Sequence, residues 1–161
     1  MEILNELAKL EPNEFVGINV QMKPDQFQDD RQEIEVFGPS LLTLCTIDRA
    51  YIIDLYKLTN KSKARNLLDD KLSWAFRMLP VIFVSFNMPT MVNYFREFLP
   101  SYRFLQYIPR IIDVKFMFYK VKLMGERTFA LVYYILFGKK FDLSMVKTDW
   151  EKRPLDDAQL K

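Results

Sequence analysis

The side chains available for chemistry in this 161-residue sequence are carboxylates, lysines and hydroxyls, because it has no histidine and a single cysteine, Cys45. Without histidine there is no Ser-His-Asp or Cys-His triad and no histidine general base. Nearly all catalytic zinc sites are excluded for the same reason, and structural zinc sites need more cysteines than the chain has. Catalysis would therefore depend on carboxylates, which bind hard divalent cations through oxygen.

A second group of candidate residues is basic and lies in the last third of the chain. Lysine and arginine bind the phosphate backbone of nucleic acids, and aromatic rings between them can stack on bases. This candidate RNA-contact set contains Lys115, Lys120, Lys122 and Arg127, followed by Lys139 and Lys140 and interleaved with Phe116, Phe118 and Tyr119. The alternative, which is the simpler interpretation, is a solvated strand face over a core of aromatic residues.

Methionine and aromatic side chains gather in the middle of the chain. Large, soft side chains of this kind are favoured at protein interfaces. The predicted interaction surface consists of Met88, Met91, Tyr94, Tyr102, Phe104 and Tyr107. The same side chains could instead fill the core, and the sequence leaves both interpretations open.

Composition predicts one packed, soluble domain. Half of the residues are hydrophobic and 15% are aromatic, which is ample for a core. The net charge of +2 neither supports nor excludes a nucleic-acid partner. The single cysteine favours a reducing, intracellular compartment, without separating cytoplasm from nucleus. The longest apolar run, Phe129–Phe137, is far shorter than the roughly 20 residues that span a bilayer, so we expect no membrane association.

Hydrophobic periodicity predicts the elements that must position these side chains. In the first half, Pro12 ends a stretch with helical spacing, and alternation of apolar and polar residues then marks a strand. The patterns predict a helix in residues 1–12, a strand at 15–22, a loop at 23–38, and a hairpin with strands at 41–47 and 50–55.

In the second half, prolines and a glycine mark where helices begin and end. Asp156 and Gln159 have the spacing of a capping box that opens a last helix. The predicted elements are a helix ending before Pro80, a strand at 81–86, a helix from Pro89 to Leu99, a strand at 111–121, and a helix at 129–136 capped by Gly138. Together they predict a single α/β domain with helices on the faces of a mixed sheet.

The segment at residues 148–155, followed by Gln159-Leu160, resembles a known family element. It reads Thr-Asp-Trp-Glu-Lys-Arg-Pro-Leu and is similar to the S-x-W-x-x-R-P-L-x-x-x-Q-L element of ribonuclease D-like 3′–5′ exonucleases, including the Werner and Nibbler types. Residues 15–18 and the hairpin strands resemble the first three strands of that family. The resemblance covers residues 14–161 and implies a ribonuclease H-like fold, a central mixed sheet flanked by helices, preceded by the N-terminal helix of residues 1–12.

Active members of this family bind two Mg²⁺ or Mn²⁺ ions with four carboxylates. The first motif, Asp-x-Glu on the first strand, corresponds here to Asn19 and Gln21, and the aspartate of the second motif corresponds to Thr90. The third motif would begin after Lys161, so we expect the core to stop before it. The resemblance therefore implies no catalytic residues, no bound metal and no cofactor.

Resemblance and lost ligands together suggest a catalytically inactive pseudonuclease. We expect it to bind a protein partner within RNA or small-RNA processing, with RNA as a second candidate ligand. Formation of a homo-oligomer is left open by the sequence. One alternative is an active metal-dependent 3′–5′ exoribonuclease that uses other acids, for which the candidates are Glu14, Asp25, Asp54 and Asp113. Another is an active enzyme inactivated by substitution, and a third is a sequence-tolerant RNA binder.

Overall fold

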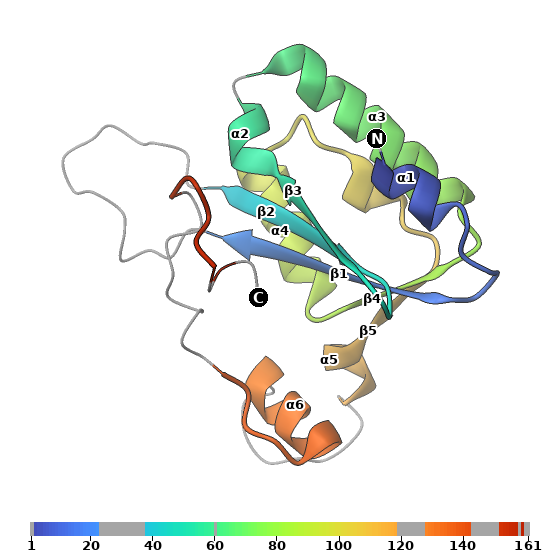
Figure 1. Ribbon diagram of the computed structural model, residues 1–161, viewed down its shortest axis with the longest axis vertical. Coiled ribbons are helices and arrows are strands. Elements are labelled where there is room, and N and C mark those ends of the chain that lie inside the picture. Colours follow the sequence, from blue (N-terminus) through green and yellow to red (C-terminus); the bar gives the residue numbers. More distant parts are fainter. Residues whose placement is uncertain are drawn as a thin grey trace.

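The computed structural model describes residues 2–22, 38–59, 61–118, 128–142, 152–157 and 159. Its elements (Figure 1) are α1 Glu2–Leu7, β1 Phe15–Met22, β2 Pro39–Cys45, β3 Ala50–Asp54, α2 Leu55–Thr59, α3 Ser62–Met78, β4 Ile82–Ser85, α4 Met88–Phe98, the 3₁₀ helix η2 Phe104–Tyr107, β5 Ile111–Asp113, α5 Val114–Met117 and α6 Phe129–Phe137. Apart from Gly38, the loop predicted at residues 23–38 lies outside the described residues.

The described strands form one mixed sheet in the order β3-β2-β1-β4-β5. β1 pairs antiparallel with β2, and β2 with β3, whereas β1 and β4 run parallel, as do β4 and β5. The predicted hairpin is confirmed: the Thr46 N–H donates to the Arg49 carbonyl at 2.8 Å and closes the turn between β2 and β3. The α/β class and the mixed sheet are confirmed as well.

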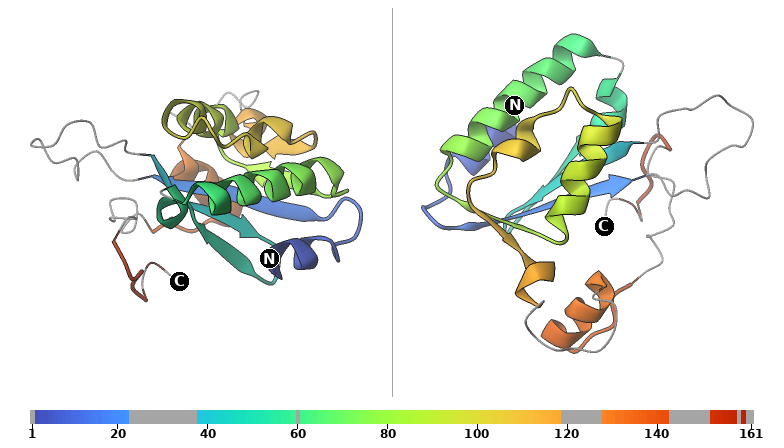
Figure 2. Two further views of the ribbon diagram at one scale, coloured as in Figure 1. Left: turned by 90° about the horizontal axis from the view of Figure 1, so that it is seen from above. Right: turned by 180° about the vertical axis from the view of Figure 1, so that it is seen from behind.

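The hydrophobic core lies on one face of this sheet. Along β1, Val16 and Ile18 are buried, whereas Asn19 between Ile18 and Val20 is exposed. The view from behind shows α3, α4 and η2 together over the core face (Figure 2). Phe76 of α3 contacts Phe83 of β4, with ring centroids 4.7 Å apart. Period-two alternation thus directs the core residues toward the helices and the polar residues of β1 to the other face.

Two buried or half-buried carboxylates cap helices in this core. Asp69 of α3 accepts the backbone N–H groups of Arg103 and Phe104 at 2.6 and 2.9 Å, at the beginning of η2. Asp113, at the end of β5, accepts the N–H groups of Asn87 and Met88 at 2.9 and 2.7 Å. Since the first N–H groups of a helix have no partner within it, each carboxylate fixes a helix start to a distant element.

The strand predicted at residues 111–121 is confirmed at Ile111–Asp113 and wrong at residues 114–118. β5 ends at Asp113, because the Asp113 side chain also accepts the Lys115 N–H at 3.0 Å and caps the short helix α5. An aspartate inside the segment favours a helix start, because its side chain can accept the N–H groups that open a helix. Residues 119–121 lie outside the described residues.

Two predicted caps near the end of the chain are confirmed. Gly138 follows α6 with φ of +64° and donates its N–H to the Tyr134 carbonyl, as a glycine C-cap does. Asp156 and Gln159 exchange side-chain bonds to each other's backbone N–H, both at 2.9 Å, so the bonds of the capping box form, whereas the described residues 156, 157 and 159 are not assigned to a helix. In the described part of the chain, no helix has the length and apolar character needed to cross a membrane.

Candidate site at the carboxyl ends of β1 and β4

A shallow cavity of about 180 Å³ lies where β1 and β4 end and α4 begins. Parallel strands bring their carboxyl ends to one edge of a sheet, which is where open α/β folds place ligands. The lining residues are Asn19, Val20, Met22, Phe86, Asn87, Thr90, Met91 and Tyr94. The structure therefore brings together Asn19 and Thr90, two positions that the sequence resemblance links to the metal site.

Gln21, the third such position, lies on the same face of β1 as Asn19 but does not line the cavity. Its cross-strand neighbour is Leu41, whereas that of Asn19 is Thr43. The pairing register shifts between Gln21 and Met22, an irregularity that bends a strand locally. The donors presented by these three positions are two amides and one hydroxyl, all uncharged at neutral pH.

The beginning of α4 has no free N–H groups to offer an anion. Met88 donates to Asp113, and Pro89 has no N–H. Thr90 and Met91 donate to the Asn87 carbonyl at 3.2 and 3.4 Å. Helix starts commonly bind phosphate through such groups, so here the internal carboxylate of Asp113 has taken that role.

Asp54, one of the alternative metal ligands, binds Arg153 instead. Arg153 Nε and Nη2 donate to the two carboxylate oxygens at 2.6 and 2.7 Å, and the Lys57 N–H adds a third bond at 2.9 Å. Burial raises the pKa of the Asp54 carboxyl, but the bonds from Arg153 and Lys57 outweigh it and lower the pKa below its ordinary value. Asp54 is therefore an ionised partner of arginine.

The other alternative acids do not gather around the cavity either. Glu14 precedes β1, at the opposite end of the strand from the cavity, and accepts the Glu11 N–H at 2.8 Å. Asp113 accepts three backbone N–H groups, and Asp25 lies outside the described residues. Among the described residues there is no group of three or more histidine, cysteine or acidic side chains that could bind a metal. Two divalent cations do not fit these neutral donors.

For most of the predicted interaction surface, burial favours the core alternative that the sequence left open. Met88, Met91, Tyr102 and Phe104 belong to the core cluster. Phe95 of α4 contacts both Tyr102 and Phe104 edge to face, which turns these rings inward. Tyr94 is the exposed member, with 40% of its surface accessible, and the Tyr107 side chain lies outside the described residues.

The predicted RNA-contact set is only partly described. Lys115 is half-buried on α5, whereas Lys120, Lys122 and Arg127 lie outside the described residues. The sequence did not single out Phe86 and Asn87, which line the cavity. The Asn-Met-Pro order at a helix start is the signal that could have indicated Asn87, which adopts a left-handed conformation with φ of +63°.

Comparison with known proteins places the fold. No family model and no curated protein matches the sequence. Among solved structures, the Aedes aegypti Nibbler EXO domain has a TM-score of 0.74 and 22% identity over 99% of this chain and 73% of that one. Escherichia coli RNase D, an exoribonuclease involved in structured RNA processing, has a TM-score of 0.69 and 15% identity, and the chain spans 36% of it.

The RRP6 catalytic core from Trypanosoma brucei is similar to the same degree. Its TM-score is 0.69 at 12% identity, over 99% of this chain and 38% of that one. Agreement with three exonuclease structures over nearly the whole chain confirms the resemblance at the level of architecture. The chain has the α/β fold of RNase D-like 3′–5′ exonucleases.

Proposed function

We propose that this chain is a catalytically inactive 3′–5′ exonuclease-like domain that acts as a binding module for a protein partner. The observation that supports this most directly is the cavity at the ends of β1 and β4. Asn19 and Thr90 meet there, with Gln21 beside them on β1, where the resemblance would require carboxylates. An amide or hydroxyl oxygen offers a metal no negative charge to offset its own.

The distribution of nearby acids supports the same proposal. Two adjacent divalent cations need several carboxylates that can turn toward them. Asp113 is fixed by three backbone N–H groups, and Asp54 by Arg153. Recruiting either acid to a metal would leave helix N–H groups or a guanidinium without its partner, at a cost of about 1–3 kcal/mol.

A role in RNA or small-RNA processing is the context that we propose for this module. It rests on fold similarity to RNase D and the Nibbler EXO domain, and fold alone is a modest argument for function. RNA is a second candidate ligand, through the basic set that includes Lys115. Steep loss of RNA affinity with added salt would mark contacts of that kind.

The test combines isothermal titration of Mn²⁺ with cleavage of a 3′-labelled single-stranded RNA. The proposal expects no heat of metal binding and no shortened RNA, while RNase D trims the same substrate as a positive control. The competing proposal, an active exoribonuclease, expects both signals. RNA trimming by the parent chain that disappears in Asn19→Ala, a change at a position lining the cavity, would overturn the proposal that the domain is catalytically inactive.

A further inference from the structure

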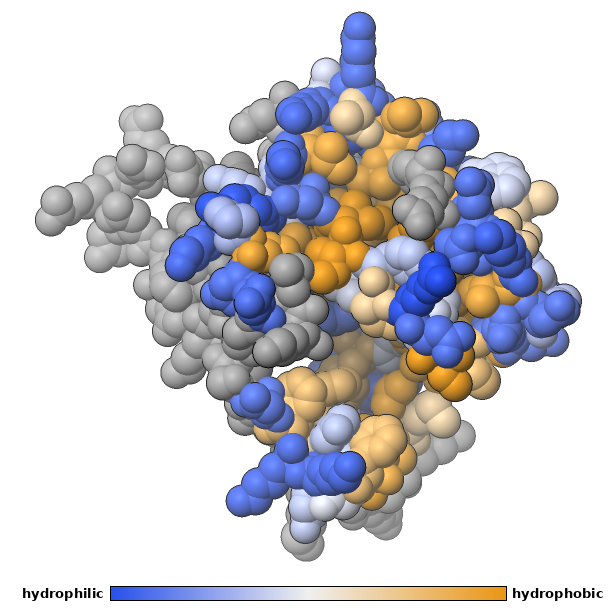
Figure 3. Space-filling model, in the orientation of Figure 1, coloured by the Kyte–Doolittle hydropathy of each residue, from blue (hydrophilic) through white to orange (hydrophobic). Residues whose placement is uncertain are grey.

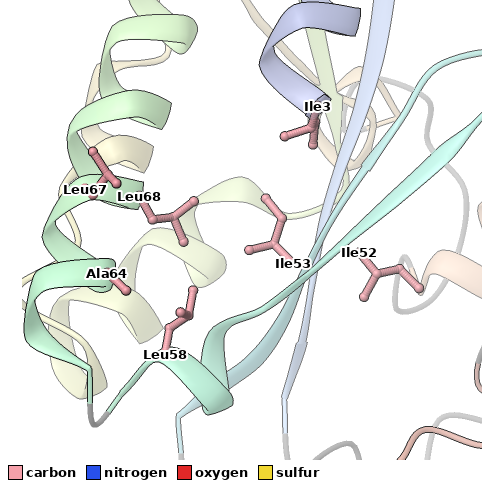
Figure 4. Close-up of a pocket in the computed structure, with 7 residues that line it drawn as sticks. All are labelled: Ile3, Ile52, Ile53, Leu58, Ala64, Leu67 and Leu68. Atoms are coloured by element: carbon pink, nitrogen blue, oxygen red, sulfur yellow. The ribbon is translucent and has the colours of Figure 1, made fainter. Parts of the chain in front are cut away.

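A hydrophobic groove lies beside β3, away from the cavity described above. Its volume is about 450 Å³, and its lining residues are Ile3, Ile52, Ile53, Leu58, Ala64, Leu67 and Leu68. They come from α1, β3, α2 and α3 (Figure 4). The space-filling view shows hydrophobic surface in this part of the molecule, bordered by hydrophilic residues (Figure 3). Leu67 is 56% exposed, which is unusual for a leucine that helps to form a continuous apolar wall.

The groove runs along a strand edge that no described strand pairs with, because β3 is the terminal strand in the described part of the sheet. The Thr46 N–H donates to the Arg49 carbonyl, so Thr46 and Arg49 are a hydrogen-bonded pair. From that pair onward, hydrogen-bonded and non-hydrogen-bonded pairs alternate along β2 and β3. Leu44–Tyr51 and Leu42–Ile53 are then the bonded pairs, and Ile52, opposite Thr43, directs its N–H and C=O away from β2.

Ile52 and Ile53 offer two different kinds of contact at this edge, backbone hydrogen bonds and an apolar side chain. Figure 4 shows the Ile53 side chain directed toward Leu58 and Leu68, and the Ile52 side chain directed to the opposite side of β3. Ile52 thus borders the groove with its backbone, while Ile53 contributes its side chain. β3 also has no proline or lysine, the residues with which proteins commonly block pairing at an edge.

Charge is asymmetric along the groove. At its α2–α3 end, Lys57, Lys61 and Lys63 are all exposed. Lys61 is also the N-cap of the 17-residue helix α3 and makes no side-chain cap bond, so the helix dipole adds positive potential at the same end. Asp54, the acid at this end of β3, is already paired with Arg153.

We propose that this groove binds an extended segment of a partner protein, which adds to β3 as a sixth strand. Alternate apolar side chains of that segment enter the groove, and acidic residues at one end lie against Lys57, Lys61 and Lys63. Strand addition uses backbone bonds for affinity and pockets for specificity, and β3 offers both. This inference deepens the proposed binding role and rests on it.

A second copy of this chain fits the edge less well. Two β3 strands related by a twofold axis run antiparallel, so the lysine-rich end of one meets the Arg49 end of the other. Arg49 and Lys9 are exposed there with Glu6 between them, and Glu6 lies within ion-pair distance of both. With Asp48 beside Arg49, that end carries as many acids as bases, so it offers the three lysines no acidic surplus, whereas an acidic partner segment does.

The first experiment is selection of a phage-displayed library of random peptides on the whole chain. We expect a consensus of alternating apolar residues over about six positions, with acidic residues at one end. A synthetic fluorescent peptide with that consensus is then titrated by anisotropy. Methylation of its alternate backbone nitrogens keeps every side chain and removes strand pairing, so it should abolish binding.

Matched variants locate the site. Leu67→Lys should weaken peptide binding at least about tenfold, because it places a charge in the apolar groove. Ile52→Pro removes the outward N–H without breaking a bond to β2, and it should weaken binding by at least the same factor. Met78→Lys, on the same helix at a similar exposure of 65% but outside the groove, should leave affinity unchanged. Equal binding by Leu67→Lys, no alternating consensus, or unaffected binding of the methylated peptide each overturns the proposal.

Two further readouts separate the alternatives. Sedimentation of the chain alone should show a monomer, and a dimer that Ile52→Pro dissociates would make a second copy the occupant and overturn the partner proposal. The Mn²⁺ and RNA-cleavage assay depends on the cavity at β1 and β4, so the inactive-domain proposal can fail while peptide binding stands. If only peptide binding fails, the proposal that the groove binds a partner strand is overturned, and the proposed loss of catalysis is unaffected.

Discussion

Arg153 binds Asp54 through two parallel hydrogen bonds, although the two residues are 99 positions apart in the sequence. The guanidinium also lies over the Tyr56 ring, with its central carbon 5.7 Å from the ring centroid. The Arg-Pro-Leu element that carried the sequence resemblance is thus the element that attaches the last described segment to the end of β3. Its role here is structural.

The Arg153–Asp54 pair should contribute about 1 kcal/mol of coupling energy, since both side chains keep roughly a quarter of their surface accessible. A double-mutant cycle with Arg153→Met and Asp54→Asn, followed by urea unfolding, measures it. Because the folded-state pKa of Asp54 is lowered, this stabilisation is present above the ordinary pKa of 3.8 and is lost as the pH falls through the folded value. A coupling energy that persists in strong acid would contradict the ion pair.

Asp69 should be among the more sensitive polar positions. Asp69→Ala removes the acceptor of the Arg103 and Phe104 N–H groups, and we expect a loss of about 3 kcal/mol in the free energy of unfolding. Asp70→Ala, next to it on α3 but exposed, is the matched control and should change stability by less than about 0.5 kcal/mol. Equal effects of the two substitutions would show that capping of η2 is unimportant.

Tyr102 should give a distinctive alkaline response. Burial raises the pKa of its hydroxyl from 10.0 to about 12, and the oxygen has no hydrogen-bond partner in the described structure. Tyr102→Phe should therefore change stability by less than about 1 kcal/mol at neutral pH. Above pH 10 the unfolded phenol ionises first, so the parent chain loses stability as the pH rises toward the folded pKa.

The measurement for Tyr102 is the difference in unfolding free energy between the parent chain and Tyr102→Phe, taken at neutral pH and near pH 11. Other tyrosines and lysines titrate alike in both proteins and cancel in that difference. We expect the difference to move in favour of the phenylalanine variant as the pH rises. A constant difference would mean that the hydroxyl is accessible to water.

Acids placed in the cavity and beside it on β1 should create a metal site. The triple variant Asn19→Asp, Gln21→Glu and Thr90→Asp should bind Mn²⁺ by isothermal titration, with heat that the parent chain lacks. Without metal, the added carboxylates repel one another, so its melting temperature should fall and then recover when Mn²⁺ is supplied.

The matched control for this gain adds the same charges elsewhere. Asn66→Asp, Ser101→Asp and Gln106→Glu change three exposed residues that do not line the cavity. This control should show neither the metal heat nor the Mn²⁺-dependent recovery. Metal binding by both triple variants would indicate nonspecific attraction to added charge and would remove support from the assignment of the cavity.

Local sequence rules predicted the elements that depend on neighbours in the chain. The alternation of β1, the Gly138 cap and the Asp156–Gln159 capping box all involve residues within a few positions of one another, and each is confirmed. The cavity was predictable in part, since the resemblance named Asn19 and Thr90 and the fold brings them together.

The features that sequence missed depend on distant contacts. Asp113 also accepts the N–H groups of Asn87 and Met88, 26 and 25 positions away, a contact that no local pattern indicates. For Tyr102 and Phe104 the sequence left surface and core both open, and their edge-to-face contacts with Phe95 place them in the core. The groove lies beside β3 because β3 is the last of the described strands at that side of the sheet, and a local pattern cannot indicate where a sheet ends.

The free edge of β3 has a consequence for the timing of assembly. The β2–β3 hairpin is a local contact, whereas β1 must wait for β4, which follows α2 and α3 in the chain. Local contacts form early, and α2 and α3, which line the groove, follow the hairpin in the chain before β4. A partner strand that adds to β3 can therefore join a nascent chain before the parallel half of the sheet has closed, so that folding and complex formation become a single event.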